Sequence, residues 1–509
     1  MRGTKPRARL NLRSIAVTVL LYAVCAALVV FHYGAAPAAA PAPAMPAVAA
    51  KPPEPPAVAA KPPPPPLAAK PPEPLALAAK PPEAPPLAAK PPPPPLAAKP
   101  AAADDDRAVH VVFSTDCSGY QHWQGIALWY ASRAAGHVGP ITRIASGCDE
   151  AQQKAVSREW RAVDATGDFR AHFAPTGALR GGYKYSNKPS GLYHWLTHAT
   201  FSETYVILID PDMLMLKPLT VDVAAGLARG PRNAKKQYEF VDGHGVAQLL
   251  SVFDRPADRV RKGRPAGQHF GIGGVWARAG TPAARPSWVS FSKATVCGER
   301  GPCVTTSAKD ADDKYGVGPV YAAHVDDWRV IASRWVAAMP RVHAQYPQLL
   351  AEMYALTMAA ANTTIPWSLV SSYMVSDPKT QSPTEAWTWV DDLAKGDPGA
   401  VCRGATATEF PAATRDRRAV ALPKTLHYCQ RYELAGVFWA KRKTPHDLFR
   451  CDRAHLDFDV GALMAALEAT APPPSRVDAR TAFMLCHLIP LANSFIDAYK
   501  RDACPPPIT

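Results

Sequence analysis

A proline-rich repeat between residues 47 and 100 sets the strongest limit on how this chain of 509 residues can fold. The repeat unit is close to AVAAKPPEPP, and nearly half of the 55 prolines lie in it or just before it. Proline lacks a backbone N–H and fixes φ, so runs such as 62–66 favour polyproline II over helix or sheet. We therefore expect a disordered or polyproline II stalk at 34–106, rich in Pro, Ala and Lys, and a globular domain at 107–509. The stalk is interpreted as a spacer, with hydroxylation and glycosylation of the stalk itself as the alternative.

An apolar segment precedes the stalk. Residues 14–33 read SIAVTVLLYAVCAALVVFHY and contain no Asp, Glu, Lys or Arg. As a helix with a rise of 1.5 Å per residue, such a segment spans about 30 Å, the thickness of a bilayer core. Residues 1–13 carry five basic groups and no acid, and the positive-inside rule keeps such a tail in the cytosol. We predict a basic cytosolic tail at 1–13, a transmembrane signal anchor at 14–33 and a lumenal body, which is a single-pass type II topology. A cleaved signal peptide is the alternative, and it also delivers the body to the secretory pathway.

The net charge of +14 does not indicate a nucleic-acid partner. The basic tail and the six lysines of the repeat supply most of the excess, so the globular part is much closer to neutral. A basic patch on a folded face would be the expected signature of nucleic-acid binding. We therefore expect no nucleic acid among the partners.

The cysteines indicate disulfides rather than a zinc site. Cys25 lies in the apolar segment, and the other nine are dispersed without a CxxC pair, which argues against a zinc ribbon. In an oxidising lumen some of these should pair, and an odd number leaves at least one free. Our expected pairs are Cys297 with Cys303 and Cys486 with Cys504.

Strand-type and helix-type segments alternate from residue 108 onward. Apolar runs predict strands at 108–114, 139–146 and 205–209. Helical spacing predicts helices at 123–135, 190–199, 326–338, 347–361 and 481–499. This alternation predicts an α/β fold with a parallel sheet in one large, two-lobed unit. Ligand sites in such sheets lie beyond the carboxyl ends of the strands.

Two carboxylates follow the predicted strand at 205–209. The string TYVILIDPDMLML places Asp210 and Asp212 on either side of a proline, and residues two apart on an extended chain point the same way. Both can face one Mg²⁺ or Mn²⁺ ion, which would bridge a diphosphate and neutralise the charge that builds as a glycosyl bond breaks. Asp-Pro-Asp also forms plain Asx turns. An aspartyl-phosphatase pattern is disfavoured because Leu214 stands where that pattern needs Thr or Val.

Several longer stretches carry a family resemblance. They are VHVVFSTDCSGYQHWQ (109–124), GPITRI (139–144), NKPSGLYHWL (187–196), YVILIDPDM (205–213), PRVHAQYPQLLAEMYALTMAAA (340–361) and LHYCQRY (426–432). With these stretches the chain resembles the peptidyl serine α-galactosyltransferases of plants and green algae and, more distantly, the hydroxyproline O-arabinosyltransferases. The resemblance implies a GT-A-like glycosyltransferase fold, in which helices flank a Rossmann-like mixed sheet. It also implies a Golgi or ER membrane enzyme whose catalytic domain is lumenal.

The resemblance further implies a reaction. A metal-dependent enzyme would transfer galactose from UDP-galactose, with Mn²⁺ (or Mg²⁺) and with retention of configuration, to serine of hydroxyproline-rich cell-wall glycoproteins. One alternative is arabinose transfer from UDP-arabinofuranose to hydroxyproline. A non-catalytic, wall-associated sugar-binding protein is an alternative of another class, and a lumenal metal-dependent phosphatase is a third.

Three candidate residues belong to the reaction centre that the resemblance implies. His427 would be the third metal ligand, or else a structural histidine beside a strand end. Glu352 is a lone carboxylate among apolar helix residues, and would orient the acceptor, stabilise an oxocarbenium-like centre or act as a nucleophile. If Glu352 lay on the surface of the helix instead, its carboxylate would need no functional explanation. Lys188, which follows Asn187 before a helix start, would contact a donor phosphate or else be a solvated loop lysine.

The remaining candidates would contact the donor. Ser114, Thr115 and Asp116 end the first strand, where a uridine or ribose contact is expected, although strand-end turn chemistry also explains them. Gly273 lies in the glycine-rich GQHFGIGG (267–274), which would let the backbone approach a sugar or would form a plain turn. Arg431 would bind the diphosphate or form a surface ion pair.

Overall fold

A computed structural model describes most of the chain after residue 108, and all of its described residues lie in one compact unit, Pro95–Thr509. The described residues are 109–179, 181–221, 227–232, 237–242, 247–251, 259–380, 384–403, 423–469 and 471–505, with backbone alone for those within 222–258. The predicted tail (1–13), anchor (14–33) and stalk (34–106) lie outside these residues.

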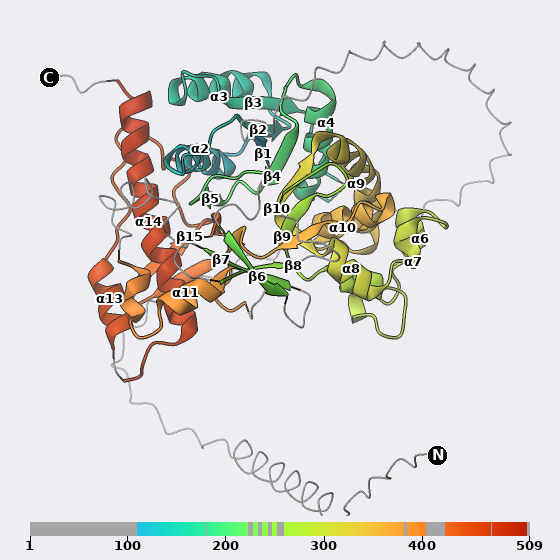
Figure 1. Cartoon of the computed structure of the whole chain (residues 1–509). Helices are drawn as coiled ribbons and strands as arrows, with labels where there is room; N and C mark the ends of the chain where they lie inside the picture. The colour runs from blue at the N-terminus through green and yellow to red at the C-terminus, as the bar shows by residue number, and fades with distance from the viewer. Residues whose placement is uncertain are drawn as a thin grey trace, which may run out of the picture. The chain divides into compact units, whose positions relative to one another are not determined.

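A ten-stranded mixed sheet forms the centre of this unit (Figure 1). In sheet order the strands are β3 (Phe169–Ala174), β2 (Ile141–Ser146), β1 (Val109–Thr115), β4 (Tyr205–Ile209), β10 (Val317–His324), β9 (Ala266–His269), β11 (Ser368–Val370), β8 (Ala247–Ser251), β7 (Gln237–Asp242) and β6 (Leu227–Arg232). The first four strands in this order are mutually parallel, and they include the three strands predicted from apolar runs. The sheet is mixed, as the family resemblance implied, and the parallel sheet suggested by the strand–helix alternation covers only this part of it, because β10 runs antiparallel to both β4 and β9. An apolar run marks a strand but carries no information about its direction.

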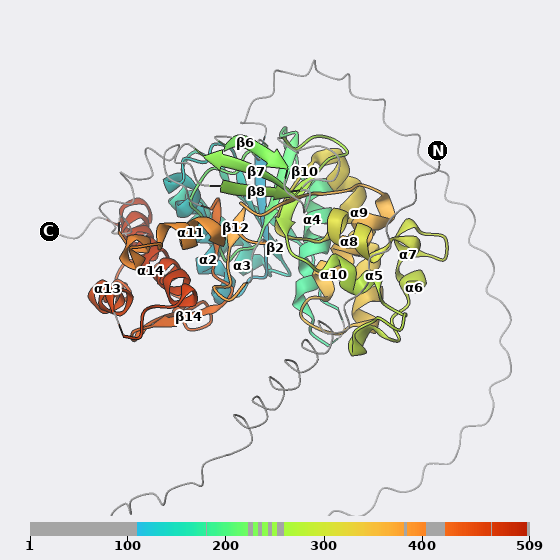
Figure 2. The same ribbon diagram turned by 60° about the horizontal axis from the view of Figure 1, so that its bottom comes forward.

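Alternating side chains of the parallel strands serve two separate cores. In β1, Val109, Val111 and Phe113 belong to one core, and Val112 belongs to the other. The first core includes residues of α2 (Gly119–Ala134), α3 (Glu150–Val163) and α14 (Arg476–Ala503). The second includes residues of α4 (Asn187–His198), α9 (Val325–Gln345) and α10 (Ala351–Thr363). Because successive strand side chains point to opposite faces, one strand supports both layers of helices. Figure 2 shows α14 and α10 on opposite sides of the sheet.

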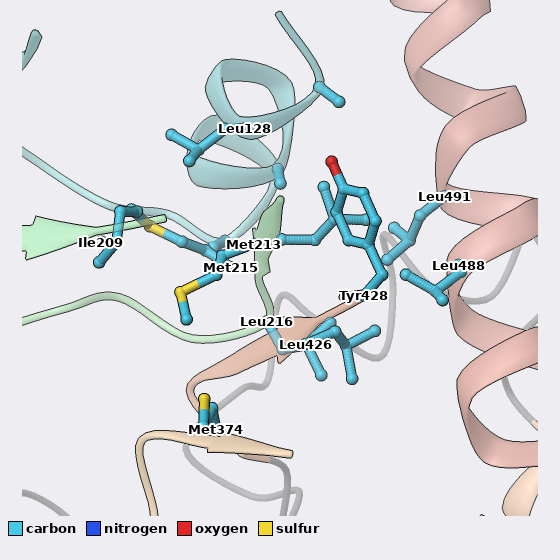
Figure 3. Packing of buried hydrophobic residues seen from close by; sticks show 14 of the residues in the cluster. Leu128, Ile209, Met213, Met215, Leu216, Met374, Leu426, Tyr428, Leu488 and Leu491 are labelled. Atoms are coloured by element: carbon cyan, nitrogen blue, oxygen red, sulfur yellow. The ribbon is translucent and has the colours of Figure 1, made fainter. Parts of the chain in front are cut away.

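A small three-stranded sheet packs beside the first core. Its strands are β12 (Met374–Val375), β13 (Thr425–His427) and β5 (Met213–Met215), and β5 follows β4 after only three residues. Figure 3 shows its apolar side chains with those of α2 and α14: Leu128, Met213, Met215, Leu216, Met374, Leu426, Tyr428, Leu488 and Leu491. This packing holds β5 and β13 next to Asp210 and Asp212, which follow β4.

Helix α14 confirms the predicted C-terminal helix and extends it at both ends. Ser475 begins the helix with a capping box, in which its side chain accepts the N–H of Asp478 while the Asp478 side chain accepts the N–H of Ser475. Within the described residues this is the one helix long and apolar enough to cross a membrane, but 78% of its apolar window is buried in the fold. We interpret it as a core helix.

Disulfides tie loops to this framework. The pairs are Cys117–Cys148, Cys297–Cys303, Cys402–Cys486 and Cys451–Cys504, and Cys429 is free among the described cysteines. The expected Cys297–Cys303 pair is confirmed. The expected Cys486–Cys504 pair is wrong, because both residues lie along α14 and the helical rise separates them by about 27 Å, far beyond the Cα spacing of a disulfide.

Arg480 of α14 holds the loop before α11 (Trp387–Leu393) and supplies a stability prediction. Its buried guanidinium donates two 2.6 Å hydrogen bonds to Asp391 and further bonds to the carbonyls of Pro378 (3.1 Å) and Thr380 (2.8 Å). We expect Arg480→Met to lower the free energy of unfolding by about 2 kcal/mol, because the partners lose a charged donor but Asp391 retains some water. Urea unfolding would measure this loss. The exposed Arg476→Met on the same helix should change it by less than about 0.5 kcal/mol, and equal effects of the two variants would contradict the prediction.

Candidate functional site

Asp210 and Asp212 lie at the carboxyl end of β4, between that strand and β5. Ile209, the last residue of β4, pairs with Phe113 of β1, so the two carboxylates emerge beside the end of the neighbouring parallel strand. Asp212 is only 4% exposed, whereas Asp210 is partly open to solvent. The strand end that the sequence pattern indicated therefore presents both carboxylates together.

His427 reaches the same point through strand pairing. In the antiparallel pairing of β13 with β5, His427 lies opposite Met213, and the N–H of Tyr428 donates to the carbonyl of Asp212 (3.0 Å). The His427 Nε2 atom lies 3.5 Å from Oδ1 of Asp212 and 3.8 Å from Oδ2 of Asp210. One ligand atom from each of the three residues lies within 4.8 Å of the others.

The donor set fits a divalent cation. The two distances from the His427 nitrogen exceed the 2.7–3.2 Å of a good N–H···O hydrogen bond, so the three side chains converge without bonding to one another. Carboxylate oxygens with one imidazole nitrogen are ligands that Mn²⁺ accepts, and the oxygens alone suit Mg²⁺. The geometry is therefore compatible with the predicted metal site.

Two lysines balance the acidic pair. Lys188 lies 2.7 Å from Oδ1 of Asp210, and the Lys441 amine donates to Oδ2 of Asp212. Burial would raise the pKa of Asp212, but His427 and Lys441 outweigh it and hold that pKa well below its usual range. Burial would lower the pKa of His427, but Cys429 and Asp212 raise it overall. Asp212 is therefore kept ionised at neutral pH.

Glu352 joins this charge network through Lys188. It is 3% exposed at the start of α10, and the Lys188 amine lies 3.3 Å from its Oε2 atom. Among the described residues, neither Oε1 of Glu352 nor the hydroxyl of the buried Tyr321 has a hydrogen-bond partner. Burial raises the pKa of Glu352 to about 7, with Lys188 opposing the rise and Asp210 adding to it. Both the helix-surface alternative for Glu352 and the solvated-loop alternative for Lys188 are excluded by this burial.

Arg143 organises the end of β1. This fully buried side chain donates to Oγ1 of Thr115 (2.7 Å) and to the carbonyl of Asp116 (2.9 Å). The Asp116 carboxylate accepts the N–H and hydroxyl of Ser118 and lies 3.0 Å from the amine of Lys184. These contacts fix the strand end and connect it to Lys184, the first residue of a short 3-10 helix (Lys184–Ser186).

One cavity of about 1100 Å³ brings most of the predicted residues together. Its lining includes Ser114, Thr115, Asp116, Asn187, Lys188, Asp210, Asp212, Glu352 and His427. Asn187 also has a structural task, since its Oδ1 atom accepts the N–H of Gly177 (2.8 Å).

Two predicted residues do not line the cavity. Gly273 begins α5 (Gly273–Ala277), where a Cβ would collide with the carbonyl of Ala311 in α8 (Ala308–Tyr315). The glycine there permits close helix packing. Arg431 pairs with Glu433 on the exposed face of the hairpin formed by β14 (Arg431–Leu434) and β15 (Val437–Ala440). We therefore leave both residues out of the candidate site.

Comparison with known proteins links the chain to one group of enzymes. The peptidyl serine alpha-galactosyltransferase of Arabidopsis thaliana is 32% identical over 158 residues, covering 30% of this chain and 18% of that protein. The enzyme of the same name from Chlamydomonas reinhardtii is 28% identical over 272 residues, covering 50% of this chain and 30% of that protein. The chain is a distant homologue of both. No protein-family model matches it.

Solved structures give a looser likeness. The galactosyltransferase LgtC, in complex with donor and acceptor sugar analogues, aligns with 66% of this chain and 93% of its own, with a TM-score of 0.32 and 12% identity. The bifunctional glycosyltransferase WbbM aligns with 65% of this chain and 47% of its own, with a TM-score of 0.31 and 12% identity.

The structure adds residues that the sequence did not single out. Lys441 follows β15, and only the hairpin fold brings it to Asp212. Glu385 lines the cavity and accepts hydrogen bonds from the N–H (2.6 Å) and hydroxyl (2.7 Å) of Ser376. Tyr183 and Tyr185 line another part of the cavity. The KRK run at 441–443 was the available signal for Lys441, but nothing in it indicates a pairing with Asp212.

Proposed function

We propose that this protein is a metal-dependent glycosyltransferase with a GT-A-like fold, which transfers galactose from UDP-galactose to serine of hydroxyproline-rich glycoproteins. The convergence of Asp210, Asp212 and His427 in one large cavity, at the end of β4, carries this proposal. The distant homology to peptidyl serine alpha-galactosyltransferases supports the donor and the acceptor. The aligned regions span 18% and 30% of those relatives' own lengths. We therefore propose the donor and the acceptor, and the screen described below tests both.

In the proposed site, Asp210, Asp212 and His427 hold Mn²⁺ or Mg²⁺. The bound metal supplies charge neutralisation for the diphosphate leaving group. Lys441 contacts Asp212, and its amine is a point charge suited to a phosphate oxygen. Ser114, Thr115 and Asp116 lie at the neighbouring strand end of the same cavity, where we place the nucleoside.

Glu352 is the carboxylate that we place beside the reacting carbon. Its buried, partly unpartnered side chain would stabilise positive charge on an oxocarbenium-like centre. For retention, the acceptor hydroxyl attacks from the face of the leaving group, and its proton passes to the departing phosphate. The same position also allows Glu352 to act as a nucleophile, which is the alternative retaining route.

A donor and acceptor screen tests the reaction. Purified protein would be offered UDP-galactose or UDP-arabinofuranose with peptides that contain Ser next to hydroxyproline, with Mn²⁺ or with a chelator. We expect galactose on serine, loss of at least about 100-fold of the rate on chelation, and recovery when Mn²⁺ is returned. Arabinose on hydroxyproline alone would favour the arabinosyltransferase alternative. Sugar binding that survives chelation, with no UDP release, would favour the non-catalytic alternative.

We also propose that residues 14–33 anchor the protein in the Golgi or ER membrane with the cavity in the lumen. The uncharged apolar segment, its basic N-terminal flank and the disulfides of the folded unit support this topology. In sealed microsomes a C-terminal tag should resist protease until detergent is added. Digestion of the tag without detergent would contradict the topology.

A further inference from the structure

The lining of the cavity includes two chemically different groups of residues. One is the charged group of Asp210, Asp212, His427 and Lys441, and the other is the aromatic and apolar group of Tyr183, Tyr185, His343, Pro347 and Leu349. The cavity of about 1100 Å³ is slightly larger than the usual site for one small molecule, which has about 300–1,000 Å³. We call the group of Tyr183, Tyr185 and His343 the aromatic shelf.

Hydrogen bonds fix the aromatic shelf next to Glu352. The ring of Tyr183 lies 5.3 Å from that of Tyr185 and 4.3 Å from that of His343, measured between centroids. The Tyr183 hydroxyl accepts the N–H of Glu352 (2.9 Å) and donates to the carbonyl of Leu349 (3.1 Å). The shelf is therefore held beside the backbone of Glu352, and both line the same cavity.

The shelf has an anchored side and an exposed side: Tyr183 packs against the second core, Tyr183 and His343 are half-buried, and Tyr185 is exposed. Tyr185 is 46% exposed and the adjoining Leu349 is 60% exposed. Gly181 and Gly182, with φ of +82° and +78°, supply the left-handed turn that leads into the shelf, and Lys184 ties the same loop to Asp116. Exposed aromatic and apolar side chains grouped in the lining of a cavity mark a binding surface.

We propose that the aromatic shelf binds the acceptor peptide, by contacting a proline-rich, extended segment that flanks the acceptor serine. The identity of the acceptor rests on the proposed function, whereas the binding of a proline-rich segment is argued from the aromatic residues of the shelf. Polyproline II segments dock on aromatic-lined grooves, and little chain entropy is lost because they are already extended. The position of the shelf beside Glu352 favours a substrate over a remote partner, since the bound peptide would deliver its serine to the reaction centre.

The chain's own stalk has the same proline-rich chemistry, but residues 34–106 contain no serine or threonine. It cannot supply the acceptor hydroxyl of the proposed reaction. We therefore assign the shelf to a separate acceptor peptide, and binding of the stalk in its place is one of the outcomes that the test distinguishes.

Tyr185→Ala in the full-length protein tests the assignment. We expect the KM for a proline-rich serine peptide to rise about tenfold, as for truncation of an important aromatic contact, with the KM for UDP-galactose unchanged. Tyr185→Trp should restore most of the peptide affinity. Tyr193→Ala is the matched control, because Tyr193 is 38% exposed on α4 and does not line the cavity.

Direct binding of a fluorescent proline-rich serine peptide to the full-length protein separates this inference from the proposed function. Suppose that no sugar is transferred but Tyr185→Ala still weakens peptide binding about tenfold relative to Tyr193→Ala. The result would support peptide binding at the shelf and contradict the proposed reaction. Equal peptide affinity of the two variants would overturn the shelf. A higher KM for UDP-galactose alone would assign it to the nucleotide, and peptide binding seen only after deletion of residues 47–100 would assign it to the stalk. Either result overturns the proposal.

Discussion

Asp212→Asn should reduce the rate of metal-dependent sugar transfer by about 1,000-fold or more, since a correctly held metal supplies several kcal/mol of transition-state stabilisation. Asp212 is the more buried of the two carboxylates, and it contacts both His427 and Lys441. The amide keeps the shape but cannot balance the charge of Lys441, so the site loses a metal ligand and the partly buried Lys441 ammonium loses its partner. Steady-state UDP release would measure the rate, and calorimetric titration with Mn²⁺ would measure metal affinity independently of turnover.

The control for this prediction is a carboxylate outside the cavity. Asp326→Asn removes the partner of Lys262 in an exposed ion pair at the start of α9, and it should leave the rate and the Mn²⁺ affinity within about twofold of the wild type. If Asp212→Asn kept more than a tenth of the transfer rate with an unchanged requirement for Mn²⁺, the metal would have to be held elsewhere.

The two aspartates could be predicted because their signal is local. A short buried strand is followed at once by Asp210 and Asp212. This pattern places both residues at the carboxyl end of the strand, with their side chains pointing the same way. His427 is different, because its place depends on the register of β13 against β5, which connects residues far apart in the sequence. It entered the prediction through resemblance to a family, and the structure supplies the physical reason.

Residues that depend on loop geometry could not be predicted in this way. Lys441 reaches Asp212 only because the β14–β15 hairpin turns the chain back, and Tyr185 lies in a three-residue 3-10 helix, Lys184–Ser186, which is too short to show a periodic pattern. Gly273 shows the opposite error. A glycine-rich string indicates close backbone approach, but here the close neighbour is the carbonyl of Ala311 rather than a ligand.

The sheet illustrates a similar limit. Apolar runs identified β1, β2 and β4, which lie together in the parallel half of the sheet. Strand direction in the other half depends on the path of the connections, and β10 returns antiparallel beside β4. The candidate site lies at the end of the predictable half, which explains why the site was easier to locate than the whole sheet.

Glu352→Gln should lower kcat by about 100- to 1,000-fold, because the amide cannot offer a negative charge to an electron-deficient carbon. Burial raises the pKa of Glu352 to about 7, so the turnover of the wild type should increase as the pH rises through about 7 and the carboxylate ionises. The variant should lose this part of the pH profile. Glu468→Gln, on an exposed helix end, should keep both the rate and the profile.

As the pH rises, the free energy of unfolding of the wild type should fall while its turnover increases. A carboxyl whose pKa is higher in the folded than in the unfolded protein binds its proton more tightly when folded, so ionisation weakens the fold. With an ordinary pKa of 4.5 and a folded value of about 7, the stabilising contribution is present below pH 4.5 and is lost as the pH rises to about 7. Relative to Glu352→Gln, the wild type should lose up to about 3 kcal/mol of unfolding free energy between pH 4.5 and pH 8. Urea unfolding with a chelator present would measure this difference. Parallel pH–stability curves for the two proteins would show that Glu352 titrates normally, and the pH dependence expected for turnover would then require another group.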